Sequence, residues 1–81
     1  MPPRTRAHRP PRPAVRAALR RHLRDASLSC TEAAERTLAG LAPHTLAIQG
    51  SDAEGVIELW DTEGDYTAPV AGIDVATREV R

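Results

Sequence analysis

Residues 29–60 read SCTEAAERTLAGLAPHTLAIQGSDAEGVIELW, and the spacing of the apolar side chains changes from helical to strand-like within this stretch. The first part has apolar side chains three or four positions apart, at Cys30, Ala33, Ala34, Leu38 and Leu41. Ser29 and Glu32 stand at the two positions of a capping box, and Gly40 favours an end to the helix. The pattern therefore predicts a helix at about 30–41.

Strand-like alternation of apolar and polar residues begins after Pro43. It predicts three strands, separated by turns rich in glycine and acidic residues, at 45–49, 56–60 and 66–75. The third strand is expected to be irregular at Pro69, which has no N–H to donate, and a last short strand follows at Val80. In the second strand, Ile57 and Leu59 are expected to face the helix.

The two signs of charge are separated along the chain. Its 81 residues include 11 basic and 11 acidic side chains, so the formal net charge is zero. Residues 1–24 contain eight arginines and no acid, whereas residues 25–81 contain all eleven acids and the other three arginines. The chain is thus a basic N-terminal part joined to an acidic body.

Proline divides the basic part further. Residues 1–13 hold five prolines and four arginines, a composition that predicts a disordered Arg/Pro-rich arm. Residues 14–27 have apolar side chains at helical spacing among arginines, which predicts an amphipathic basic helix. Residues 28–81 form the body. The expected fold class is α+β, with one helix packed on a three-stranded antiparallel β-meander and preceded by the arm and the additional basic helix.

Three segments of the body match the pattern of a known family. The helix reads TEAAERTL at 31–38, the hairpin reads VIELWDTEGDY at 56–66, and the closing segment reads IDVATREV at 73–80. Over about residues 28–81 these segments resemble a PepSY domain, the small α+β module of peptidase propeptides and many bacterial envelope proteins. The resemblance implies a small bacterial, non-enzymatic protein-interaction module that binds, and restrains or inhibits, a protein partner.

Groups suited to catalysis or metal binding are scattered. Nucleophilic catalysis needs a nucleophile, a base and an orienting group close together, and Cys30 is expected to be a buried thiol on the apolar face of its helix. The three histidines lack the spacing of a zinc site. The acidic segments 52–54 and 61–65 are expected to be solvated turns. We therefore expect no enzyme activity, catalytic residue, metal site or cofactor.

Two surfaces are candidates for contact with a partner. The N-terminal arginines form an electrostatic footprint for phosphates or for an acidic surface: Arg4, Arg6, Arg9, Arg12, Arg16, Arg20, Arg21 and Arg24. The second candidate surface, for protein contact, comprises Val56, Trp60 and Tyr66. Trp60 is expected either on an open sheet face, as a binding anchor, or beneath the helix at 14–26.

Three other modes of association stay open beside the protein-binding module. Nucleic acid is one partner, bound through residues 1–24 with little sequence specificity, because no aromatic side chains are interleaved for stacking. The acidic body is also a candidate mimic of nucleic acid that inhibits a nucleic-acid-binding protein. Pairing of the basic arm with the acidic body of another copy would give a homo-oligomer.

Membrane and export signals do not stand out in the sequence. The apolar runs are far shorter than the roughly 18 residues that a transmembrane helix needs. A secretory signal has an apolar segment after its positive residues, and here the arginines continue instead to Arg24. We therefore expect a cytoplasmic protein with no membrane partner, or an extracytoplasmic one if the start codon is mis-assigned.

Overall fold

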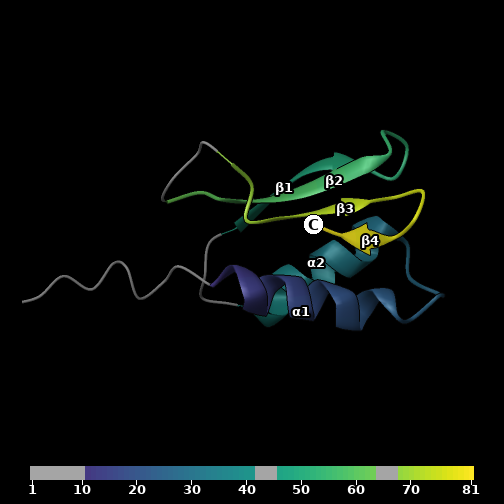
Figure 1. Ribbon diagram of the computed structural model, residues 1–81, viewed down its shortest axis with the longest axis horizontal. Helices are drawn as coiled ribbons and strands as arrows, with labels where there is room; N and C mark the ends of the chain where they lie inside the picture. The colour runs from purple at the N-terminus through teal and green to yellow at the C-terminus, as the bar shows by residue number, and fades with distance from the viewer. Residues whose placement is uncertain (1–10, 42–45, 64–67) are drawn as a thin grey trace, which may run out of the picture.

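The computed structural model describes residues 11–41, 46–63 and 68–81. These residues form two helices and four strands: α1 (Arg12–Leu23), α2 (Cys30–Gly40), β1 (Leu46–Ser51), β2 (Val56–Asp61), β3 (Ala71–Asp74) and β4 (Glu79–Val80). The strands make one antiparallel sheet in the order β1-β2-β3-β4. Helix α2 packs against β1 and β2, and α1 lies beside α2 along the β3–β4 side (Figure 1). The α+β class that the sequence predicted is confirmed.

The sheet has four strands rather than the three expected. Glu79 pairs with Asp74 and Val80 with Ile73, so the last short strand, which the sequence predicted at Val80, joins the meander as a fourth strand. The third strand is shorter than the predicted 66–75, because β3 begins at Ala71, after a proline that cannot donate to the ladder. Tyr66 lies outside the described residues.

A hydrophobic core joins both helices to the sheet. Its buried members are Val15, Leu19, Leu23, Cys30, Ala33, Ala34, Ile57, Leu59, Val70, Ala71 and Ile73. Alternation along β2 turns Ile57 and Leu59 into this core, where both side chains are fully buried, as the sequence predicted. Aliphatic side chains and a thiol thus do the packing that aromatic residues do in many domains.

Helix α1 begins and ends earlier than the predicted 14–26. It follows Pro11 as N-cap and carries a second proline in its first turn, where the missing N–H costs no helical hydrogen bond. Residues 12 and 13, expected in the disordered arm, are therefore helical, while residues 1–10 lie outside the described residues. The helix contributes Val15 and Leu19, both 0% exposed, to the core of the body.

Helix α2 starts with the predicted capping box. Glu32 N–H donates to Ser29 Oγ at 3.0 Å, and Ser29 N–H donates to Glu32 Oε1 at 2.8 Å. A second cap comes from Asp52 in the β1–β2 turn, whose carboxylate accepts from the N–H groups of Cys30 (3.1 Å) and Thr31 (2.9 Å) and from the Thr31 hydroxyl. The expectation that Asp52 is simply a solvated turn residue was wrong, because this carboxylate ties the hairpin to the helix.

The β1–β2 hairpin depends on glycine at one position. Gly50 has φ +93°, and a Cβ built there would lie 2.2 Å from the Val56 carbonyl oxygen. The conformation and the close approach both require glycine. The hairpin register that follows pairs Gly50 with Ile57 and Ser51 with Val56.

Candidate functional site

Among the described residues, neither helix lies on the sheet face opposite the core (Figure 1). Along β2, Val56, Glu58 and Trp60 alternate with the buried Ile57 and Leu59, so they lie on this uncovered face. Among the described residues, Val56 is the large hydrophobic residue that is exposed to solvent, with 40% of its surface accessible. Trp60 therefore does not lie beneath α1, the second of the two alternatives, and its role as a binding anchor stays a prediction.

Trp60 is half-buried, and its indole nitrogen has a partner on the same strand. Nε1 donates to Glu58 Oε1 at 3.1 Å. Helix α1, the alternative cover for this side chain, contributes to the core on the other side of the sheet. Trp60 therefore adds apolar surface to the uncovered face while its N–H bond orients the Glu58 carboxylate.

Two rows of residues cross the uncovered face from β2 to the C-terminal end of the chain. One row runs from Glu58 through Gly72 to Arg81, whose backbone exchanges two hydrogen bonds with Gly72, at 3.2 and 2.8 Å. The next row runs from Val56 through Asp74 to Glu79. Because Gly72 has no side chain, the first row leaves a space between the side chains of Glu58 and Arg81.

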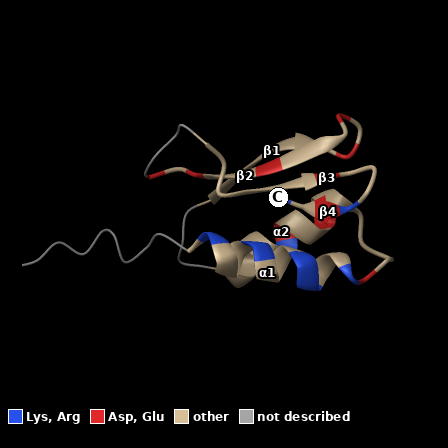
Figure 2. Cartoon of the chain, in the orientation of Figure 1, with Lys and Arg blue, Asp and Glu red and all other residues tan. Residues whose placement is uncertain are grey.

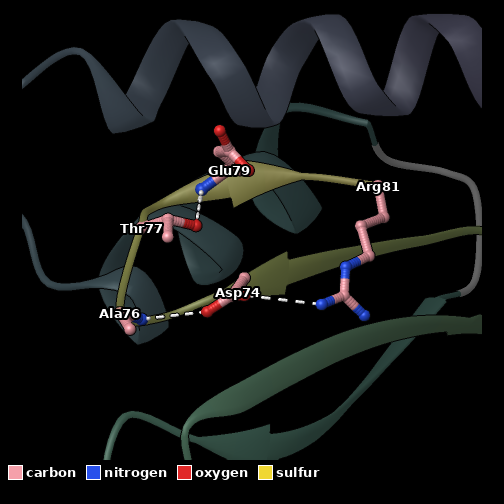
Figure 3. A network of polar contacts seen from close by, with 5 residues as sticks. All are labelled: Asp74, Ala76, Thr77, Glu79 and Arg81. Atoms are coloured by element: carbon pink, nitrogen blue, oxygen red, sulfur yellow. Dashed lines mark hydrogen bonds and ion pairs between the residues drawn. The ribbon is translucent and has the colours of Figure 1, made fainter.

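Asp74 connects the two rows. Its carboxylate accepts from Arg81 Nη2 at 3.4 Å and from Ala76 N–H at 3.1 Å, as Figure 3 shows. In the same turn Glu79 N–H donates to Thr77 Oγ1 at 3.3 Å. These bonds hold the β3–β4 turn and draw the Arg81 side chain back across β3.

A groove of about 300 Å³ lies where α1 meets the sheet beyond the end of β4. Its charged lining comes from Arg12 and Arg16 on α1, Glu58 on β2, and Arg81, while Val56, Pro69, Gly72 and Ile73 are among its uncharged residues. Arg12 Nη1 donates to the Pro69 carbonyl oxygen at 2.9 Å and so joins α1 to the segment before β3. The groove thus combines three guanidinium groups, one carboxylate and apolar walls.

Arg16 has a different setting from the surface position that the sequence predicted. Its side chain is half-buried, and its Nε is fully buried without a hydrogen-bond partner. A buried donor that has lost water and gained no acceptor is unfavourable. Arg16 is therefore a cation that lines the groove and has an N–H donor without an acceptor.

The arginines in the second half of α1 and at its C-cap face solvent. Arg20, Arg21 and Arg24 are exposed, and Figure 2 shows the basic residues gathered along α1 and acidic residues on the strands and turns. Residues 12–24 contain no acid, so the helix has no opposite charge of its own to offset the arginines. Like charges four positions apart on a helix each cost about 0.2–0.5 kcal/mol. The predicted contacts Arg4, Arg6 and Arg9 lie outside the described residues.

Cys30 is buried as predicted, with 1% of its surface exposed. Burial raises the pKa of the thiol, and the guanidinium of Arg78, 4.0 Å from Sγ, opposes that shift in pKa. A protonated thiol without access to solvent is a poor nucleophile. Its place in the structure is therefore that of a core side chain.

The acidic segment 61–65 is described as far as residue 63, and it differs from the expected solvated turn at Asp61. Asp61, expected in a solvated turn, is buried at the end of β2 and accepts from Glu63 N–H at 2.9 Å. Over residues 11–41, 46–63 and 68–81, no group of three or more His, Cys, Asp or Glu side chains could hold a metal ion. In the same residues, no helix has the length and apolar character that crossing a bilayer requires.

The groove could not be predicted from the sequence, because its residues come from four segments that are far apart along the chain. The sequence predicted the N-terminal arginines together as one contact surface. Their regular spacing does not distinguish Arg12 and Arg16, which line the groove, from Arg20 and Arg24, which do not. Only the approach of α1 to the sheet distinguishes them. The signal available in the sequence was the run of arginines itself.

Comparisons with known proteins leave the family open. No protein-family model matches the sequence. No curated protein and no solved structure is similar enough to count as a match. The resemblance to PepSY stays a prediction that rests on the residues of the body.

Proposed function

We propose that the chain is a small non-enzymatic protein-interaction module that holds a protein partner on the uncovered face of its sheet. The observation that carries this proposal is the placement of both helices away from that face. Antiparallel sheets often leave one face to water. Here, however, the face bears the exposed Val56 and the half-buried Trp60, and a groove of about 300 Å³ lies beside it, between α1 and the sheet.

The chemistry of this face supports protein binding. A few side chains, most often Trp, Tyr and Arg, provide most of the energy at protein interfaces, and charges around them provide orientation and specificity. Glu58, Asp74 and Glu79 supply such charges in neighbouring positions of β2, β3 and β4. A partner that lies across these strands would cover Val56 and Trp60 and meet these three carboxylates, with the Arg81 guanidinium beside Asp74.

Site-specific photo-crosslinking in the cells that produce the protein tests the proposal. Ala47 is exposed on β1 and pairs with Trp60, so a photoreactive residue there reports on the uncovered face. Ala39 is exposed on α2 and serves as the matched control position. We expect one discrete protein adduct from position 47 and not from position 39. Equal adducts from both positions, or none from position 47, would contradict the proposal.

A second candidate function is nucleic-acid binding through α1. The observation that favours it is the solvent exposure of Arg20, Arg21 and Arg24 on a helix segment without acids. Arginine makes bidentate contacts to phosphate, and such contacts give affinity that falls steeply with salt. The arginines of residues 1–10 would extend the same footprint.

Filter binding of duplex DNA and single-stranded RNA at two salt concentrations tests the second candidate. The full chain is compared with a triple variant, Arg20→Gln, Arg21→Gln and Arg24→Gln. We expect salt-sensitive binding by the full chain and both weaker binding and a smaller salt dependence for the variant. Absence of binding at low salt would rule this candidate out.

A third candidate is association between copies, in which the separated charges of two molecules would pair. The basic α1 of one molecule is complementary to the acidic strands and turns of another, as the colours in Figure 2 indicate. Sedimentation equilibrium at low and high salt checks this, because an ion-paired dimer would dissociate as salt rises. A single monomeric mass under both conditions would exclude self-association.

A further inference from the structure

We infer that the groove between the start of α1 and the sheet binds a carboxylate carried on an apolar stem of an extended protein segment. The inference rests on the proposed function, because it names the chemical group by which a partner would be held beside the uncovered face. Four features of the groove support it: its charge, the unpartnered Arg16, its apolar walls and its size.

The charge of the groove favours an anion. Arg12, Arg16 and Arg81 bring three guanidinium groups to it, and Glu58 brings one carboxylate. Two of these arginines are already engaged, Arg12 with the Pro69 carbonyl oxygen and Arg81 with Asp74. Each makes one such contact and keeps other N–H groups available to a ligand.

Arg16 is the group that lacks an acceptor. Its Nε is buried and makes no hydrogen bond in the structure. In a bidentate pair, the two oxygens of a carboxylate accept from Nε and from a neighbouring Nη of one guanidinium. A carboxylate in the groove can accept from the Nη groups of Arg16, and it reaches the buried Nε if the Arg16 side chain turns on binding.

The uncharged lining favours a ligand with an apolar stem over a free inorganic anion. Val56, Pro69 and Ile73 contribute apolar surface to the groove, and Gly72 leaves its floor open. A volume of about 300 Å³ is at the lower end for small-ligand pockets. That space suits one acidic side chain or one chain end rather than a larger ligand.

Glu58 favours a ligand of single charge. This carboxylate lines the same groove, and its Oε1 accepts from Trp60 Nε1 at 3.1 Å. A phosphate dianion beside it would experience greater repulsion than a carboxylate. The groove therefore matches a glutamate side chain or a C-terminal carboxylate of a partner.

The test uses four probes and the ¹⁵N-labelled full chain. The probes are acetyl-Val-Ile-Val as free acid, the same peptide as C-terminal amide, acetyl-Val-Glu-Val amide and inorganic phosphate. NMR follows the Arg16 Nε–Hε signal and the Gly72 amide. We expect both signals to move with one or both carboxylate peptides and not with the neutral amide. The two acidic peptides distinguish a chain end from a side chain as the source of the carboxylate.

Matched variants assign the binding to the groove. Arg16→Gln is expected to weaken binding of the acidic peptide by roughly tenfold or more, the usual effect of losing a charge-assisted pair. Arg20→Gln, one turn further along α1 and exposed, should stay within about twofold of the parent. Gly72→Ala should also weaken binding, because it partly fills the floor of the groove. The new Cβ would lie 3.6 Å from the Ile57 carbonyl oxygen, an ordinary contact that the fold accepts.

Several results would overturn the inference. They are binding of the neutral amide equal to that of the acids, binding of phosphate alone, equal losses in Arg16→Gln and Arg20→Gln, or no movement of the Arg16 signal with any probe. Crosslinking at position 47 does not depend on the groove residues. If that adduct forms while the peptides fail to bind, the carboxylate site is wrong and the interaction module stands.

Discussion

The guanidinium of Arg78 donates to the Leu23 carbonyl oxygen at 2.8 Å, which joins the β3–β4 turn to the last residue of α1. The same group also donates to the carbonyl oxygens of Leu28 (3.0 Å) and Asp25 (3.3 Å). Carbonyl groups at the end of a helix lack helical partners, and a cation there is favourable. Arg78 therefore caps α1 and holds the connection from α1 to α2.

Replacement of Arg78 should destabilise the whole fold. Arg78→Ala removes three hydrogen bonds from a charged donor and leaves carbonyl groups partly unsatisfied. We expect the free energy of unfolding to fall by about 1–3 kcal/mol. Urea denaturation followed by circular dichroism measures it, with Arg21→Ala on the exposed side of α1 as control. Equal stability of the two variants would show that the Arg78 contacts contribute nothing.

The backbone at Arg78 allows a finer test. Its φ of +60° lies in the left-handed region, which favours glycine over other residues. Arg78→Gly should therefore be more stable than Arg78→Ala by about 1–2 kcal/mol, although both lack the guanidinium. The reverse order in the urea midpoints would contradict the strain assigned to this turn.

Asp52 should make stability depend on pH. Hydrogen bonds from the Thr31 hydroxyl and then from the Thr31 and Cys30 N–H groups lower the pKa of this carboxyl. Since its pKa is lower in the folded state than the unfolded value of about 3.9, its contribution is present above that value and disappears as pH falls through the folded pKa. Asp52→Ala should cost about 0.5–2 kcal/mol at pH 7, as the loss of a helix cap does.

The check compares urea midpoints of the parent and Asp52→Ala at pH 7 and at pH 3. The difference between them should shrink at the lower pH, because pH 3 lies below the unfolded pKa of about 3.9, where the unfolded parent binds a proton and part of the stabilisation by Asp52 is lost. Glu54→Ala, an exposed acid in the same turn, is the matched control and should differ little from the parent at either pH. A difference that stays constant with pH would show that the charge of Asp52 plays no part.

Replacement by alanine should lower the stability at Gly50 and leave it nearly unchanged at Gly72. Gly50→Ala places a methyl group 2.2 Å from the Val56 carbonyl oxygen at φ +93°, and we expect a loss of about 1–3 kcal/mol or more. Gly72→Ala meets only ordinary contacts and should leave the melting temperature within a few degrees of the parent. Calorimetry measures both. If Gly50→Ala melts at the same temperature as the parent, the hairpin geometry described for β1 and β2 is wrong.

Helix α1 should be necessary for the body to fold. Leu19 is fully buried, and Leu19→Ala should cost about 2–5 kcal/mol by opening a cavity. A fragment of residues 25–81 should lack the folded circular-dichroism spectrum, because it loses Val15 and Leu19 from the core. The triple glutamine variant of the exposed Arg20, Arg21 and Arg24 is the control and should stay folded. A folded 25–81 fragment would show that the body is independent of α1.

Local patterns in the sequence were enough to predict the elements near residues 29–60. The capping box of Ser29 and Glu32 and the helical spacing after it place α2 within one residue of its end. Alternation in β2 correctly separates Ile57 and Leu59 from Val56. These predictions succeed because each depends on residues a few positions apart, whose side chains share a face of one helix or strand.

Only the tertiary structure decided which polar side chains reach across the fold. Asp52 caps a helix 21 and 22 residues away, Arg78 binds carbonyl groups 50 to 55 residues away, and Arg12 reaches Pro69. Periodicity carries no information on such pairs, because it describes the neighbours of a residue within one element. By itself the sequence determined the α+β class, the cap of α2 and the buried face of β2. The packing of α1 against the sheet determined the groove, since it brings Arg12 and Arg16 to Glu58 and Arg81 and leaves Arg20 and Arg24 in solvent.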